Sequence, residues 1–283
     1  MWGCRNYRHS PMFCHRRDAS KVAGRGSHFH NFDSPTWTPV SNDSFKQGPG
    51  RVRNPLTPLV HLDMLRPCYL HTFHLGWGRL INGAIIYELA LEQHFGAGAL
   101  SEQLAAAHVR LKERARANRV ACNQPKFTAS RINVLKKKDA AELKGKGWNS
   151  RVVTAWLSQE VQRAERQDDH HDLRVSVVFC LAGLYSLLEQ APLLLSAQQA
   201  DEAYQSGMTA LKCYQLLNAQ AAGPHWPLRP KAHWVHHSLE DTRAWRVDLK
   251  MRCERARERE SERAGERESE RAREREHMLR LVS

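Results

Sequence analysis

Several features that would assign this 283-residue chain to a common class are missing. No uninterrupted apolar run reaches the roughly 18 residues that a membrane-spanning helix needs. The longest run covers residues 175–188, contains Tyr185 and two serines, and is typical of a core helix. The first 30 residues include five Arg but no apolar stretch, so they do not resemble a secretory signal. We therefore expect an intracellular protein that makes no contact with a membrane.

Paired cysteines and nucleophile motifs are missing as well. The seven cysteines are scattered and never form Cys-x-x-Cys, which argues against a disulfide framework or a zinc ribbon and favours reduced thiols. No Gly-x-Ser-x-Gly sequence occurs, and the Lys144–Ser150 segment lacks the residue order of a phosphate-binding loop. These absences disfavour a serine hydrolase and a P-loop nucleotide-binding protein.

The chain instead carries a large excess of positive charge, with 43 Lys+Arg against 30 Asp+Glu. The C-terminal tail contributes none of this excess, because residues 252–276 hold nine Arg and nine Glu. The tail repeats the eight-residue pattern RARERESE and has no apolar seam, so it is not a coiled coil. We expect a low-complexity helix or coil here, and we hypothesise that it is encoded by repetitive purine-rich DNA.

The remaining sequence divides into two parts. Residues 1–55 are rich in Gly, Pro, Ser, Asn and His, which predicts a disordered basic leader in which Trp37 and Phe45 could touch the folded part. Residues 56–245 form the predicted helical domain, and residues 246–283 form the tail. The fold class is therefore mainly α, an irregular helical domain that is a fragment of a larger fold.

Apolar residues at spacings of three and four predict the helices of this domain. A Ser196-x-x-Gln199 capping box is expected to begin one helix, and Asp172 is expected to cap the central one. We interpret the acidic and histidine cluster at 168–172 as capping in preference to metal binding. The predicted helices cover 79–95, a stretch from Ser101, 127–135, 148–163, 173–189, a stretch from Ser196 to Gly223, and 231–245, with a short extended run at 59–62.

Two groups of histidines have spacings that can hold a metal ion. Cys68, His71 and His74 lie three residues apart and, with Asp63, could bind a divalent ion, although buried histidines at a helix start are the favoured interpretation. Farther along, His233 and His237 are four apart on one predicted helix, beside His236 and Glu240, but the His-Glu-x-x-His order is absent. We favour a helix end with solvated imidazoles. We thus predict no metal site, and His74, His233 and His237 are the weak candidates.

The segment Cys68-x-x-His71, followed by Thr-Phe-His-Leu-Gly and an amphipathic helix, resembles the signature of CACTA-type cut-and-paste DNA transposases. A later Pro230-Lys231-Ala-His233 block is similar to one found in transposase-derived proteins, so the resemblance spans about residues 56–245. It implies an RNase H-like core whose acidic triad binds two metal ions and cleaves DNA. The catalytic positions it implies are Asp63, Cys68 and His71, with a later acid in the region of Glu240 and Asp241.

This site is expected to be incomplete, since no strand precedes residue 56 and the Arg/Glu tail follows the last acid. A basic stretch with interleaved aromatics nevertheless predicts contact with nucleic acid, the alternative being a solvated loop. We therefore expect a transposase-derived, nuclear, DNA-binding protein that needs no cofactor. The alternatives are an active transposase or nuclease that uses a divalent metal such as Mg²⁺, or a helical protein-interaction module. The predicted nucleic-acid-binding residues are Arg131, Lys136, Lys137, Lys138, Lys144, Lys146, Trp148 and Arg151.

Overall fold

A computed structural model describes most of the predicted helical domain and a few leader residues. The described residues are 14, 19, 30–32, 37–39, 41, 67–136, 140–166, 168–221 and 225–246. They are mainly helical and include no strand, which confirms the predicted fold class. The expectations for Asp63, Lys137, Lys138, Phe45, the run at 59–62 and the tail after 246 lie outside these residues.

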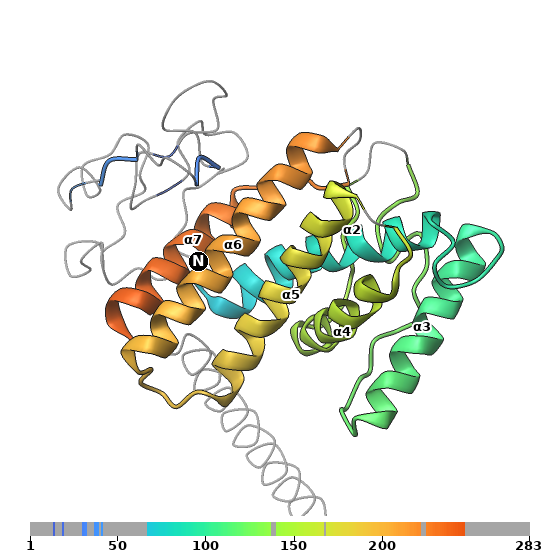
Figure 1. The fold of residues 1–283 in the computed structure, drawn as a ribbon, viewed down its shortest axis with the longest axis horizontal. Helices are drawn as coiled ribbons and strands as arrows, with labels where there is room; N and C mark the ends of the chain where they lie inside the picture. The colour runs from blue at the N-terminus through green and yellow to red at the C-terminus, as the bar shows by residue number, and fades with distance from the viewer. Residues whose placement is uncertain are drawn as a thin grey trace, which may run out of the picture.

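Three long helices form one side of the fold. Helices α5 (Asp169–Gln190), α6 (Ala197–Gln220) and α7 (Lys231–Trp245) lie side by side, with α6 in contact with both of the others (Figure 1). The start of α6 follows from its sequence, because Ser196 Oγ accepts a hydrogen bond from the Gln199 amide (3.1 Å) and Gln199 Oε1 accepts one from the Ser196 amide (3.0 Å). The predicted capping box is thus confirmed.

The remaining elements complete the domain. The π-helical segment η3 (Leu70–Trp77) leads into α2 (Gly78–Leu91), and both pack against α4 (Gly147–Glu160), which ends in the short 3₁₀ turn η4 (Val161–Arg163). Helix α3 (Leu100–Ala117) lies at the edge of the fold, in contact with α2 and α4 (Figure 1). Since η3 also contacts α7, it connects α2 and α4 with the group formed by α5, α6 and α7.

Two local predictions were wrong. Residues 127–135 form turns in place of a helix, because Thr128 Oγ1 accepts a hydrogen bond from the Arg131 amide and Asn133 adopts a left-handed φ of 57°. Asp172 does not cap α5. Asp168 does so, and its carboxylate accepts a hydrogen bond from the His171 amide at 2.8 Å.

The long connection between α3 and α4 is held against α2. The Leu143 amide donates to the Arg79 carbonyl (2.9 Å), and the Glu142 carboxylate pairs with Arg79 (3.3 Å) and Arg229 (2.8 Å). Gly83 of α2 allows this close approach, since a Cβ there would lie 2.7 Å from the amide nitrogens of Glu142 and Leu143. The connection therefore lies directly on the α2 backbone, which fixes the start of α4.

The core includes part of the predicted leader. Trp77, Trp156 and Trp226 are the largest fully buried apolar side chains of the domain. Cys14, Ala19, Phe32 and Trp37 are also buried, and the Trp37 ring lies 4.5 Å from the ring of His233 on α7. The contact expected of Trp37 is therefore present, and these four residues add to the core, which the composition of the leader did not predict.

Helix α5 holds both the most apolar stretch and the most deeply buried charge. By length and composition alone it could cross a membrane, with a mean hydropathy of 1.3 over its most apolar window, and 44% of that window is buried in the fold. The guanidinium of Arg174 is fully buried, where it donates to both Glu92 oxygens (2.7 and 3.0 Å) and to Glu88 (3.4 Å). In this structure α5 packs between α4 and α6.

Candidate functional site

A groove of about 450 Å³ runs along α3, α4 and α5. Small and apolar side chains such as Ala115, Val152 and Ala182 line it together with arginines and two tryptophans. The polar and aromatic residues that line it are Arg114, Asn118, Arg119, Trp148, Arg151, Trp156, Gln159, Tyr185, Ser186 and Glu189. Two of the predicted nucleic-acid-binding residues, Trp148 and Arg151, therefore lie in the same groove.

Trp148 is held in a fixed orientation although 45% of it is exposed. Its indole Nε1 donates to the Ala121 carbonyl at 2.6 Å, which ties the first turn of α4 to the connection after α3. The guanidinium of Arg151 lies 3.9 Å from the ring centroid in a cation–π contact and also pairs with Glu189 at 2.7 Å. The exposed indole is thus a rigid aromatic surface at the groove wall.

Basic side chains lie on the connection that precedes this indole in the chain. Arg131, Lys136, Lys144 and Lys146 are all exposed, and the Lys144 amide donates to the Arg131 carbonyl at 2.8 Å, so these two residues are neighbours across the connection. Between residues 110 and 151 the chain has 13 Lys+Arg against 3 Asp+Glu. Most of the chain's net charge of +13 is therefore concentrated around α3 and its connection to α4.

The sequence analysis missed part of this surface. Arg114 and Arg119 line the groove, and Arg116 and Lys126 are exposed nearby in the sequence. The run Arg114-x-Arg116-x-x-Arg119 at the end of a predicted helix was a usable signal. It lies about 30 residues before Trp148, so only the fold shows that the two share one groove.

The positions implied by the transposase resemblance do not assemble a carboxylate site within the described residues. Cys68 and His71 are exposed at the start of η3, with the thiol 3.1 Å from His71 Nδ1. Asp63 lies outside the described residues. An RNase H-like core is built on a β-sheet, and the described part of the chain contains no strand on which to place an acidic triad.

His74 faces the interior. Its ring lies 4.5 Å from that of Tyr185 and 5.0 Å from that of Tyr69, and its Nδ1 is buried without a hydrogen-bond partner. Burial, with a smaller effect of the Arg151 charge, lowers the pKa of His74 to about 3. The favoured interpretation of buried, hydrogen-bonded histidines is met only in part, since His71 is exposed and the buried Nδ1 of His74 has no hydrogen-bond partner.

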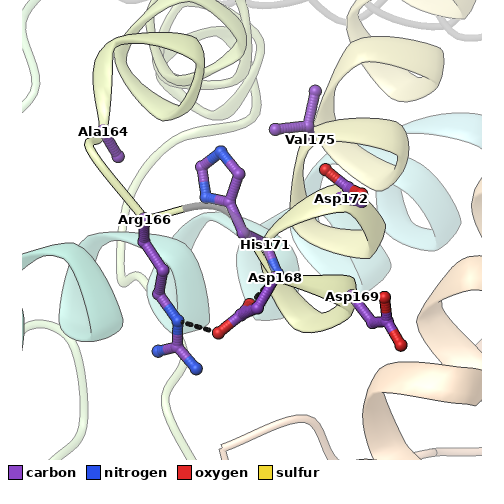
Figure 2. Close-up of a pocket in the computed structure, with 7 residues that line it drawn as sticks. All are labelled: Ala164, Arg166, Asp168, Asp169, His171, Asp172 and Val175. Carbon is purple, nitrogen blue, oxygen red and sulfur yellow. Dashed lines mark hydrogen bonds and ion pairs between the residues drawn. The ribbon is translucent and has the colours of Figure 1, made fainter.

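A second pocket lies at the start of α5 (Figure 2). Two of its charged side chains are engaged with each other, since Asp168 caps the helix and pairs with Arg166. The hydrogen bond from the His171 amide, together with Arg166, lowers the pKa of Asp168. Figure 2 shows the Asp169 carboxylate pointing away from the His171 ring. The cluster therefore acts as a helix cap, as the sequence analysis favoured.

The imidazoles of α7 are buried, so the expectation that they are solvated was wrong. His233 and His237 are fully buried and His236 is 4% exposed. Leader residues cover them, with the Phe32 ring 5.8 Å and the Trp37 ring 5.1 Å from the ring of His236. The Cys14 thiol lies 3.2 Å from His237 Nε2. These covering residues are remote in sequence, so the helix pattern alone could not reveal them.

Comparison with known proteins adds no relationship, since no protein-family model, curated protein or solved structure matches this chain.

Proposed function

We propose that the chain binds single-stranded nucleic acid along the α3–α4 groove. The observation that carries the proposal is a rigid, half-exposed indole, Trp148, within a segment holding 13 Lys+Arg against 3 Asp+Glu. Exposed aromatic rings stack on unpaired bases, and surrounding Lys and Arg side chains contact phosphates and release counterions.

Each residue has a distinct part in this binding. The Trp148 ring would stack on one base, held in place by its bond to Ala121 and by the guanidinium of Arg151. Arg151 is already paired with Glu189, so it positions the indole and adds little net charge. The phosphate contacts are assigned to Arg114 and Arg119, which line the groove, and to the exposed residues Arg131, Lys144 and Lys146 of the connection before Trp148.

A single strand suits this surface better than a duplex does. Stacking on Trp148 requires a base whose face is not covered by its neighbours, and a duplex offers such faces only at its ends. The derivation from a DNA transposase is part of the same proposal and rests on the Cys68-x-x-His71 and Pro230-Lys231-Ala-His233 motifs. It includes no catalytic role.

Fluorescence anisotropy with a labelled oligonucleotide tests the proposal. We expect Trp148→Ala to weaken binding about 5- to 150-fold, the range of one lost stacking contact. Lys144→Gln and Lys146→Gln should each lower the slope of log affinity against log salt by about 0.7. Trp245→Ala removes a similarly exposed tryptophan from α7 and Lys212→Gln an exposed lysine from α6, so both should bind as the unchanged chain does.

Three results would contradict this proposal. Equal binding by Trp148→Ala and Trp245→Ala would remove the indole from the interface. A complete absence of binding at low salt would favour a helical protein-interaction module. Mg²⁺-dependent nicking of DNA that is lost in Asp63→Ala would show that the chain is an active nuclease.

A further inference from the structure

Three ligand-bearing side chains meet in a buried cluster between the leader and α7. The Cys14 thiol, the His233 ring and the His237 ring each offer one ligand atom, and these atoms all lie within 4.8 Å of one another. All three residues are buried. We propose that this cluster binds a single Zn²⁺ ion through one thiolate and two imidazoles.

The protonation state of His237 suits this role. Its Nδ1 lies 3.0 Å from Glu240 Oε2, and because a carboxylate can only accept, Nδ1 carries the proton. The unprotonated Nε2 then faces the Cys14 sulfur at 3.2 Å. A carboxylate that orients a histidine in this way is the usual outer partner of a zinc-bound imidazole.

Binding of the ion releases one proton. Without metal, the Cys14 S–H donates a hydrogen bond to the unprotonated Nε2 of His237. When the ion binds, that proton leaves to solvent and the sulfur and Nε2 lone pairs both turn to the metal. The ion and one thiolate carry a net charge of +1, which the neighbouring Glu240 carboxylate offsets.

The surroundings and the donor set select the ion. Trp37 packs edge-on against His233 (4.5 Å) and against His236 (5.1 Å), and Phe32 stacks on His236, so aromatic rings cover the leader side of the cluster. Sulfur and imidazole donors favour Zn²⁺ over Mg²⁺ or Ca²⁺. The described residues supply three of the four ligands that a tetrahedral zinc ion takes.

Titration of the full chain with Co²⁺, a spectroscopic substitute for Zn²⁺, tests the assignment. We expect one equivalent to bind with a thiolate-to-metal charge-transfer band that Zn²⁺ then abolishes by displacement. Cys14→Ser should remove the band, and His233→Gln should lower the affinity at least tenfold. Glu240→Gln leaves the three ligands in place but loses the orienting carboxylate, so its affinity should fall about 10- to 100-fold.

Cys68→Ser is the matched control, because it removes the exposed thiol that lies 3.1 Å from His71 Nδ1. The proposal is overturned if the band survives Cys14→Ser, if it disappears in Cys68→Ser, or if Co²⁺ binds without any thiolate band. Far-ultraviolet circular dichroism reports whether each variant keeps its helices. Should Cys14→Ser unfold, Glu240→Gln decides the matter, since an unchanged Co²⁺ affinity there also overturns the proposal.

Discussion

Protonation of the His74 imidazole is strongly unfavourable in this fold. Its pKa is about 3 in the folded chain against an ordinary value of 6.5, because burial between Tyr69 and Tyr185 penalises the charged ring. Between these two pH values the unfolded chain binds more protons than the folded one. Stability is therefore lost as the pH falls from 6.5 towards 3, and the loss reaches about 2 kcal/mol at pH 5.

Urea unfolding at pH 7 and pH 5 measures this effect. His74→Leu cannot be protonated, so its stability should fall by about 2 kcal/mol less between the two pH values than that of the unchanged chain. His71→Leu, three residues earlier and exposed, should keep the full pH dependence. If His74→Leu and the unchanged chain lose the same free energy of unfolding between pH 7 and pH 5, protonation of His74 does not destabilise the fold.

At the scale of single residues, the sequence identifies candidate site residues but not the residues that they contact. The four-residue spacing of His233 and His237 is visible in the sequence and places both on one helix face. Their third partner, Cys14, precedes His237 by 223 positions, and no local pattern connects them. Trp148 was predicted from its basic neighbours, whereas its bond to Ala121 follows only from the path of the connection after α3.

At the scale of elements the helices follow from periodicity and caps. Helix α7 has the predicted bounds, and α6 begins after the predicted capping box, because these signals are local to the chain. The π-helical turns of η3 were not predicted. There a Cβ at Gly76 would lie 2.6 Å from the His71 carbonyl oxygen of the same segment and 2.9 Å from the Lys231 side chain. The second contact reflects tertiary packing, which no local pattern shows.

Two glycines within helices should respond in opposite ways to substitution by alanine. Gly83→Ala places a methyl group 2.7 Å from the backbone of Glu142 and Leu143, which cannot move without shifting the connection, so we expect a loss of about 1–3 kcal/mol. At Gly183 on α5 the nearest atom, Ser206 Oγ, would be 3.9 Å away. Gly183→Ala should therefore stabilise the chain by about 0.5–1 kcal/mol.

Thermal or urea unfolding of both variants measures the difference, and each glycine serves as the control for the other. A stabilising Gly83→Ala would contradict the close approach of the connection to α2. Because that connection carries Arg131, Lys144 and Lys146, Gly83→Ala should also alter nucleic-acid binding, whereas Gly183→Ala should not.

For the whole molecule, the basic surface and the buried leader residues belong to different parts of the fold. The basic surface belongs to α3 and the connection that follows it, while the leader residues that are described contribute Cys14, Ala19, Phe32 and Trp37 to the core next to α7. The composition of residues 1–55 predicted no such contribution, because few apolar residues there follow a helix or strand period. Their burial depends on the histidine face of α7, which is remote in sequence.

The folded unit should therefore extend beyond the helices to these leader residues. Trp37 is 5% exposed and packs on His233 and His236, so Trp37→Ala should lower the free energy of unfolding by about 3 kcal/mol, as is usual for a buried tryptophan. Trp245 lies on α7, the helix against which Trp37 packs, but is 59% exposed. Trp245→Ala should therefore change the free energy of unfolding by no more than about 0.5 kcal/mol. Urea unfolding followed by circular dichroism compares the two. Equal midpoints for Trp37→Ala and Trp245→Ala would mean that the leader adds nothing to the cooperative unit, because a tryptophan packed in that unit cannot be removed without a cavity.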